Sequence, residues 1–285
     1  MTQLQEIEFD ILKSVIQICD CLGLKYYLVC GSALGAVKYQ GFIPWDDDVD
    51  IALCRDDYEV FCEKAPEYLP KNLFLQTNRT NINYPQIFCK VRNSETTYIE
   101  SSVRHIDMNH GAYIDVFPLD GYPKDIKKQR CLELKKALLH YRQICAYEMP
   151  YNIKFYTKVL IRMERIFGFD RNINKTVQKM EKVLSKYKTD NSDIWCNHGN
   201  WQGKLEYASC KQYGNGIWAV FEGLRVRIPE DYDAYLTQKY GDWRADLPKE
   251  QQISHHFAEI IDLNRPYTDF IEKLPNGRIR IKKSE

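Results

Sequence analysis

The feature that most constrains this chain is a run of carboxylates that leads directly into a hydrophobic segment. Residues 45–51 are Trp-Asp-Asp-Asp-Val-Asp-Ile. In an extended strand the side chains alternate, so Asp48 and Asp50 should lie on one face, about 6.5 to 7 Å apart at Cα. Val49 and Ile51 should then point to the core. The segment therefore predicts a strand, over residues 49–53, that presents a pair of carboxylates.

Two carboxylates at this spacing can share a hard cation. Mg²⁺ takes oxygen ligands and is commonly held by one or two carboxylates together with the phosphates of a substrate. Gly31 and Ser32 follow a hydrophobic run and precede an expected helix at residues 33–38. A glycine there allows close backbone approach, and the helix N-terminus offers unpaired N–H groups to an anion. The pattern indicates a phosphate ester as the ligand.

Asp115 is the best candidate for a third carboxylate. It lies inside the apolar run of residues 112–117, and an ionised carboxylate without a partner is costly to bury. The residues alone leave a second interpretation open. In it, Asp46, Asp47 and Asp48 form a solvated acidic turn and Asp115 caps a loop.

Basic residues near these segments are candidates for binding phosphate. Lys90 and Arg92 are two apart on an expected strand and should share a face. Ordinary surface charge is the alternative for both. Lys38 is a further candidate, and His110 either binds substrate or caps the loop before the strand of Asp115. His255 and His256 can also reach the pocket, but paired histidines near a C-terminus are more often structural or exposed. No ligand-like spacing supports zinc.

Helical and strand patterns alternate along the N-terminal half of the chain. Apolar residues recur every three or four positions over residues 4–22, which predicts a helix that Gly23 ends. Asp56 should be the N-cap of a helix that contains Tyr58, Phe61 and Cys62. Helices should occupy 124–188 with a break near 168–174, and a hairpin over 221–228 should precede a helix over 231–240. Strands are expected at 26–30, 73–75, 85–91, 96–99 and 112–117.

The composition excludes several kinds of protein. Lysine and arginine number 40 against 39 acidic residues, for a net charge of +1, which lacks the basic field that nonspecific nucleic-acid binding needs. No stretch approaches the roughly 18 apolar residues of a membrane span, and the first segment is too charged for a signal peptide. A cytoplasmic location is expected. The 10 cysteines form no CxxC pair and should be buried thiols rather than disulfides.

Several long motifs resemble the LicD family of phosphocholine transferases, and they occur in family order. They are GSALGAVKYQGFIPWDDDVDIAL, RDDYEVF, KVRNSETTYIE, NHGAYIDVFPLDGYP and YLTQKYGDW. That family belongs to the nucleotidyltransferase superfamily and is related to fukutin-type proteins. The resemblance implies an α+β fold, with a nucleotidyltransferase-like mixed sheet flanked by helices and a helical elaboration. We expect a catalytic core over 1–123, the elaboration over 124–200, and a C-terminal part over 201–285 that completes the core and ends in a frayed basic tail.

The resemblance also implies an activity and a site. A sugar hydroxyl, in a cell-surface glycan such as lipopolysaccharide or teichoic acid or in its precursor, would attack the phosphorus next to choline in CDP-choline and release CMP. Asp48, Asp50 and Asp115 would be catalytic and would bind Mg²⁺, with Mn²⁺ as an alternative. Asp115 would complete the metal site or accept the hydroxyl proton. The remaining candidates for binding substrate are Gly31, Ser32, Lys38, Trp45, Asp46, Asp47, Lys90, Arg92 and His110.

Other activities remain alternatives on the sequence. The cargo can be ribitol phosphate or glycerol phosphate from another CDP-alcohol, or the reaction can be nucleotidyl transfer. A catalytically silent module that binds nucleotide or glycan is an alternative of another class. Choline would require aromatic faces for its quaternary ammonium, and the available tryptophans are Trp45, Trp201, Trp218 and Trp243. The chain can contact a lipid-linked acceptor at the membrane surface without a membrane-spanning segment.

Overall fold

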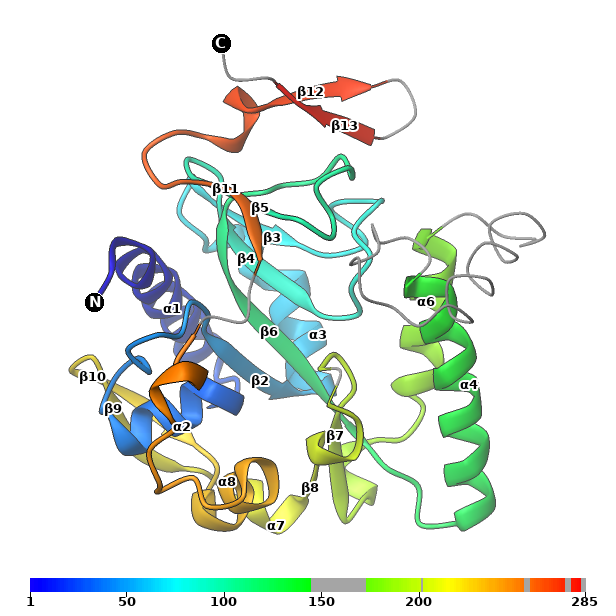
Figure 1. Cartoon of the computed structure of the whole chain (residues 1–285). Helices are drawn as coiled ribbons and strands as arrows, with labels where there is room; N and C mark the ends of the chain where they lie inside the picture. Colours follow the sequence, from blue (N-terminus) through cyan, green and yellow to red (C-terminus); the bar gives the residue numbers. More distant parts are fainter. Residues whose placement is uncertain (145–172, 201, 254–256, 275–277, 283–285) are drawn as a thin grey trace.

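A mixed sheet organises the described part of the chain. The computed structural model describes residues 1–144, 173–200, 202–253, 257–274 and 278–282 (Figure 1). The strands of the sheet are β1 (Tyr26–Leu28), β2 (Asp50–Cys54), β3 (Leu73–Gln76), β4 (Cys89–Asn93), β6 (Ala112–Gly121), β7 (Ile194–Asn197) and β8 (Tyr207–Ser209). Their order is β1-β2-β6-β4-β3, and β7 and β8 continue from the last residues of β6. β2 and β6 run parallel, and the other neighbours in this order run antiparallel.

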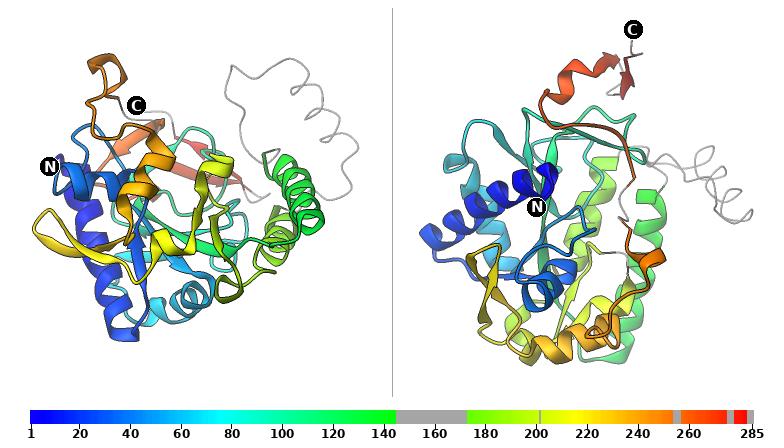
Figure 2. Two further views of the ribbon diagram at one scale, coloured as in Figure 1. Left: turned by 90° about the horizontal axis from the view of Figure 1, so that it is seen from below. Right: turned by 60° about the vertical axis from the view of Figure 1, so that its left-hand side comes forward.

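Helices cover both faces of this sheet, which confirms the expected α+β class (Figures 1 and 2). The α-helices are α1 (Gln3–Leu22), α2 (Cys30–Lys38), α3 (Arg55–Lys64), α4 (Ile126–Ile144), α6 (Ile173–Leu184), α7 (Cys210–Tyr213) and α8 (Tyr232–Tyr240). Short 3-10 turns are η1 (Ala65–Glu67), η2 (Thr189–Asn191), η3 (Gly203–Glu206), η4 (Lys249–Gln251) and η5 (Tyr267–Asp269). α1 and α3 pack in one core cluster, whereas α2, α4, α6 and α8 contribute to the other.

The alternation of side chains divides β2 and β6 between these two clusters. Ile51 and Ile114 belong to the cluster under α1 and α3. Ala52 and Phe117 belong to the cluster under α2, α6 and α8. Because successive strand residues point to opposite faces, Asp50 and Asp115 share the second face. The sheet therefore places the two acids away from α1's main packing surface, on the side where α2 begins.

Several local elements form as their sequences predict. Thr2 and Gln5 make a reciprocal capping box at the start of α1, and Gly23 ends the helix in the left-handed region at φ 67°. β9 (Ile217–Phe221) and β10 (Leu224–Ile228) form the expected hairpin. Its turn residues Glu222 and Gly223 have φ of 49° and 78°. Asp231 caps α8 by accepting a hydrogen bond from the backbone N–H of Ala234 at 3.1 Å.

Two local predictions were wrong: the turn at Gly31 and Ser32, and Asp56 as a helix N-cap. Gly31 and Ser32 do not form a separate turn, because α2 already begins at Cys30. The chain reverses instead at Cys30 itself, whose φ is 54°. Asp56 is not an N-cap, since α3 starts at Arg55, and it lies in the first turn, where an acid favours the helix dipole.

The basic C-terminal segment is also more ordered than expected. β13 (Arg278–Ile281) pairs with β12 (Ile271–Leu274), so this part is a hairpin strand rather than a frayed tail. β11 (Ala258–Asp262) pairs with β5 (Thr97–Glu100) and ties the C-terminal region to the N-terminal half. Figure 1 shows the β12–β13 hairpin at the end of the molecule next to β11 and β5.

Two further expectations concern the described residues. Their cysteines are free thiols, as predicted, but Cys21 and Cys131 are exposed rather than buried. Within the same ranges, no helix is long and apolar enough to cross a membrane. The predicted helix break near 168–174 lies mostly outside the described residues, and α6 begins at Ile173.

Candidate active site

Three charged side chains form a row across the sheet. Asp50 on β2 is the register partner of Asp115 on β6. Asp115 in turn is the partner of Lys90 on β4. Residues that are register partners in a sheet project to the same face. Strand pairing therefore brings Asp50 and Asp115 together, although they are far apart in the sequence. All three side chains are buried, with residue exposures of 7%, 7% and 4%.

Lys90, at one end of this row, forms an ion pair with the central Asp115. Its Nζ lies 2.9 Å from Asp115 Oδ1 and 3.7 Å from Glu100 Oε1. The same ammonium lies 3.3 Å from the centroid of the Tyr113 ring, which adds a cation–π contact. The interpretation of Lys90 as ordinary surface charge is therefore wrong. A buried ion pair of this kind fixes the position of the Asp115 carboxylate.

The acidic loop that precedes β2 is held by contacts from three elements. Gln5 of α1 donates from Nε2 to the carbonyl oxygen of Asp46 at 2.9 Å. Tyr98 of β5 donates from its hydroxyl to Asp47 Oδ2 at 3.0 Å. A Cβ at Gly31 would approach Asp46 Oδ2 to 2.7 Å, so the glycine makes room for this carboxylate. These contacts give the loop a defined conformation, unlike a freely solvated turn.

The start of β2 is fixed by α2. The hydroxyl oxygen of Ser32 accepts a hydrogen bond from the backbone N–H of Asp50 at 2.8 Å. The backbone N–H of Val29 donates to the carbonyl oxygen of Asp50 at 3.0 Å. Ser32 thereby joins the N-terminus of α2 to the first residue of β2. The predicted proximity of the Gly31-Ser32 segment to the acid pair is thus a feature of the fold.

Burial and mutual repulsion raise the pKa of the central acids. The pKa of Asp50 is raised well above its usual value, first by burial and then by Asp48 and Asp115, while Lys239 opposes the rise. The pKa of Asp115 is raised by burial and held down by Lys90. Asp48 precedes β2 rather than lying within it. Its negative charge nevertheless acts on both buried acids, so the three carboxylates form one electrostatic cluster.

The donor set suits a hard cation. Asp48, Asp50 and Asp115 offer carboxylate oxygens, the ligands that Mg²⁺ prefers, and a cation would relieve the repulsion that raises the pKa of Asp50. In the described ranges, no group of three or more Asp, Glu, His or Cys side chains is arranged to hold a metal ion as it stands. The chemistry of the residues fits the metal, and Lys90 is the cation that Asp115 contacts in this conformation.

Arg92 supports the row without reaching solvent. Its side chain is fully buried, and its guanidinium donates to Gln76 Oε1 at 2.5 Å, to the carbonyl oxygen of Gly111 at 2.7 Å and to Glu100 Oε2 at 2.9 Å. Each of the three guanidinium nitrogens thus donates to a partner inside the protein. The surface-charge interpretation is wrong for Arg92 too, and the geometry favours a positioning role through Glu100 over direct contact with a donor.

Two other candidates for binding substrate, Lys38 and His110, contact loops of the protein rather than the row of Asp50, Asp115 and Lys90. Lys38 Nζ lies 2.9 Å from Asp246 Oδ1 and donates to the carbonyl oxygens of Arg244 and Ala245. Lys38 thus fastens the loop after α8. His110 is fully buried, its Nε2 lies 2.9 Å from the carbonyl oxygen of Ile106, and burial lowers its pKa to about 4. A neutral His110 holds the loop before β6.

The aromatic candidates differ in exposure. Trp45 is half-buried beside the acidic loop and packs edge-on against Tyr39, with ring centroids 6.2 Å apart. Trp243 is buried and donates to Asp233, whereas Trp218 is exposed on β9. Trp201, His255 and His256 lie outside the described residues. Trp45 is therefore the described tryptophan that the chain places next to the carboxylates.

Sequence reasoning missed Glu8 of α1. Glu8 is 2% exposed, and its pKa is raised by burial and by Asp48, Asp47, Asp46 and Asp115, in that order. The signal was present, because residue 8 lies four positions after Leu4 on the apolar face of the helix. An acid on that face is a site candidate by the same argument that selected Asp115.

A second missed group lies where α8 approaches α2. Lys239 of α8 forms an ion pair with Glu206 of η3, and their side chains are 1% and 2% exposed. Asn200 donates to the thiol of Cys30 at 3.6 Å, and the hydroxyl of Tyr235 accepts a hydrogen bond from the backbone N–H of Cys30 at 3.1 Å. These contacts stabilise the positive φ of Cys30 at the start of α2.

Comparison with protein families agrees with this geometry. Residues 23–149 match the family described as LicD/FKTN/FKRP, nucleotidyltransferase domain. The chain therefore contains a LicD-family domain. The LicD domain includes β1, α2, β2, β4 and β6, and thus the whole row formed by Asp50, Asp115 and Lys90.

Two relatives extend the similarity. The chain is 26% identical to the lipopolysaccharide cholinephosphotransferase LicD of Haemophilus influenzae over 267 residues, which are 90% of this chain and 95% of that protein. It is 40% identical to the human ribitol 5-phosphate transferase FKRP over 43 residues, 15% of this chain and 9% of that protein. The first similarity continues well beyond the LicD domain into the C-terminal part.

Proposed function

We propose that this chain transfers phosphocholine from CDP-choline to a sugar hydroxyl of a cell-surface glycan or its precursor and releases CMP. The observation that carries the proposal is the buried row of Asp50, Asp115 and Lys90 inside the LicD domain. Similarity to a cholinephosphotransferase over 90% of the chain supports choline as the alcohol.

The reaction exchanges one phosphoester bond for another. The acceptor oxygen bonds to the phosphorus next to choline, and the bond from that phosphorus to the bridging oxygen of the diphosphate breaks, so that CMP takes the bonding electrons. The sugar hydroxyl loses its proton. Asp115 has a raised pKa, and a higher pKa makes a carboxylate a stronger base toward this proton when it does not ligate the metal. Phosphoryl transfer asks the protein mainly for positioning and electrostatic stabilisation.

The other residues divide into binding and positioning groups. Asp48 and Asp50, with Asp115, would hold Mg²⁺ or Mn²⁺, which supplies positive charge to the donor phosphates when bound. Lys90 holds the Asp115 carboxylate through its ion pair. Ser32 fixes the backbone of Asp50. Trp45, half-buried beside the acidic loop, offers an aromatic face to a quaternary ammonium.

A polyol phosphate is the second candidate cargo. The observation in its favour is the short segment shared with the ribitol 5-phosphate transferase FKRP. Both cargoes use the same row of charged residues, because the reacting group is the phosphate rather than the alcohol.

The decisive experiment incubates the protein with CDP-choline, CDP-ribitol and CDP-glycerol, with sugar acceptors, and measures CMP release and product mass. We expect CMP release with CDP-choline, an adduct that keeps the quaternary amine, and loss of activity in excess EDTA. A polyol adduct would assign the second cargo, and pyrophosphate from a nucleoside triphosphate would indicate nucleotidyl transfer. Tight binding of every donor without turnover would reject the enzyme and leave a binding module.

A further inference from the structure

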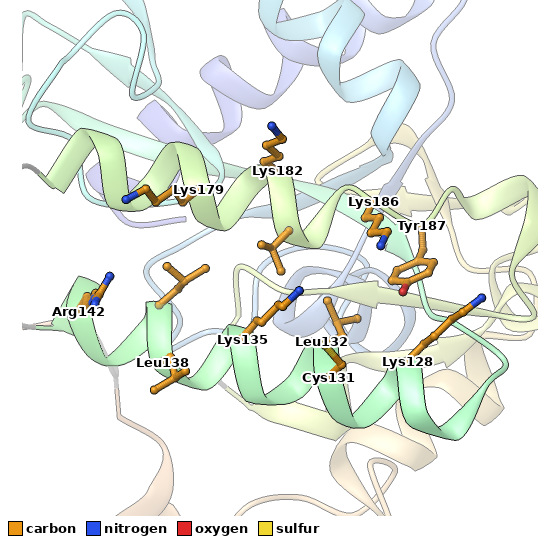
Figure 3. Close-up of a pocket in the computed structure, with 12 residues that line it drawn as sticks. Lys128, Cys131, Leu132, Lys135, Leu138, Arg142, Lys179, Lys182, Lys186 and Tyr187 are labelled. Carbon is orange, nitrogen blue, oxygen red and sulfur yellow. The ribbon is translucent and has the colours of Figure 1, made fainter.

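The helices α4 and α6 lie side by side and enclose an apolar groove away from the acid row (Figures 1 and 3). The groove has a volume of about 760 Å³. Leu132, Leu139 and Val183 contribute to its lining, and Leu132 also packs into the second core cluster. Both helices thus present a hydrophobic floor that continues from the interior to the surface.

Within the described part of the chain, every charged residue that lines this groove is cationic. They are Lys128, Lys135 and Arg142 from α4, and Lys179, Lys182 and Lys186 from α6 and its C-terminal end. Figure 3 shows these side chains along the two helices, with Leu132 between the helices and Leu138 on the side of α4 away from α6. The whole chain has a net charge of only +1, so this concentration of positive charge is local.

The acidic side chains of α4 and α6 form hydrogen bonds with residues outside the groove. Glu133 Oε1 accepts a hydrogen bond from the hydroxyl of Tyr207 at 2.6 Å. Glu181 Oε2 accepts one from Asn78 Nδ2 at 2.9 Å. Neither carboxylate lines the groove, so these two acids do not neutralise the cations that line it.

Exposed leucines accompany the basic residues on α4. Leu134 and Leu138 are 63% and 61% exposed, and their spacing of four residues places them on one face of the helix. Ile126, at the start of the same helix, is 58% exposed. A helix that combines exposed apolar side chains with lysines and arginines has the composition of helices that lie in a membrane interface.

We propose that the α4–α6 face binds the surface of a membrane that contains anionic phospholipids. Its cations match the phosphate layer, where each Lys or Arg near the surface contributes to attraction, and its leucines match the boundary of the acyl chains. Nucleic acid offers phosphates but no apolar layer for the floor of the groove. A free anion likewise leaves Leu134 and Leu138 in water. This inference concerns a different surface and does not depend on the proposed reaction.

Co-sedimentation of the full chain with lipid vesicles tests this assignment. One set of vesicles contains phosphatidylcholine alone, and the other contains equal parts of phosphatidylcholine and phosphatidylglycerol. We expect the protein to pellet with the second set and to be released by salt. The charge variant Lys135→Glu/Lys182→Glu should partition at least about tenfold more weakly.

Two further variants separate the contribution of exposed apolar surface from that of net charge. Leu134→Ser/Leu138→Ser keeps every charge but removes exposed apolar surface, and it should also weaken partitioning. Lys71→Glu/Lys249→Glu makes the same change in net charge at exposed positions outside the groove, and it should bind vesicles as the wild type does. Far-UV circular dichroism should be unchanged in all three variants, because none of the substituted side chains is buried.

Three results would overturn the proposal. The first is absence of pelleting with anionic vesicles. The second is an equal loss of binding in Lys71→Glu/Lys249→Glu, which would indicate a nonspecific charge effect. The third is a concentration-dependent dimer that Leu138→Ser abolishes, without vesicle binding, because the groove would then contact a second copy of the chain. Sedimentation requires no turnover, so none of these results bears on the transfer reaction.

Discussion

Asp50 is buried at the first position of β2, where it faces two other carboxylates. Burial and the charges of Asp48 and Asp115 raise its pKa, so its ionised form costs stability in the absence of a cation. The folded state keeps the proton of Asp50 to higher pH than the unfolded chain does. The stability that this group contributes is therefore present below the ordinary aspartate pKa and is lost as pH rises through the folded value.

The Asp50→Asn variant tests this cost and the role of the residue together. At neutral pH and without metal, its melting temperature should equal or exceed that of the wild type, because the repulsion is relieved. The advantage should disappear below the ordinary aspartate pKa. CMP release from CDP-choline should fall at least about a hundredfold, the scale for loss of one preorganised charged group. Asp190→Asn, at an exposed position, is the control. Wild-type turnover in Asp50→Asn would remove it from the site.

His110 predicts a pH dependence of opposite sign. Its pKa is lowered from 6.5 to about 4 by burial, so between these values the unfolded chain binds the proton and the folded chain does not. Stability should rise with pH across this window, by about 3 kcal/mol at most. Urea unfolding of His110→Gln should show a smaller rise, while turnover persists. A large loss of turnover with unchanged stability would support a substrate contact instead.

Sequence patterns predict the placement of the acidic candidates better than that of the basic candidates. Asp48 and Asp50 are predicted from the alternation of side chains along a strand, and Asp115 is predicted because an acid inside an apolar strand needs a partner; strand register does bring Asp50 and Asp115 together. The burial of Lys90 and Arg92 could not be predicted, since it depends on Glu100 of β5 and Gln76 of β3. Pairing between strands is a tertiary property that local patterns do not contain.

At the level of elements, the start of α2 depends on a helix from the far end of the chain. Tyr235 of α8 contacts the backbone of Cys30, and the buried pair of Lys239 and Glu206 lies next to the same thiol. The sequence predicts this helix, over 231–240, but not its docking on α2. A helix packs by side-chain complementarity with a distant surface, which no local signal records.

A double-mutant cycle measures this docking. Glu206→Gln should leave Lys239 buried without its counter-charge and cost about 3–5 kcal/mol of unfolding free energy. The double variant Glu206→Gln/Lys239→Met should recover most of this loss, because neither charge is then buried alone. Chemical denaturation of the two single variants and the double variant provides the coupling energy. Strictly additive losses would show that the pair does not stabilise the junction of α8 and α2.

At the scale of the whole molecule, the C-terminal region supports the acidic loop through β5. β11 pairs with β5, and Tyr98 of β5 holds Asp47 through its hydroxyl. The route runs from the C-terminal segment through one strand to the carboxylates. It explains how a region more than 200 residues away in sequence can influence the site without contributing a proposed catalytic residue.

Truncation after Ile253 tests that route, because it removes β11, β12 and β13 together. Ile99 of β5 is fully buried against the C-terminal segments, and exposing it should cost about 1.5–3 kcal/mol. Turnover should fall as well, because β5 loses its only β-pairing partner among the described strands and Tyr98 then fixes Asp47 less firmly. Truncation after Leu274 is the matched control, since it removes β13 but retains the β5–β11 pair. It should keep most turnover, and equal losses in both truncations would mean that the hairpin, rather than β11, supports the acidic loop.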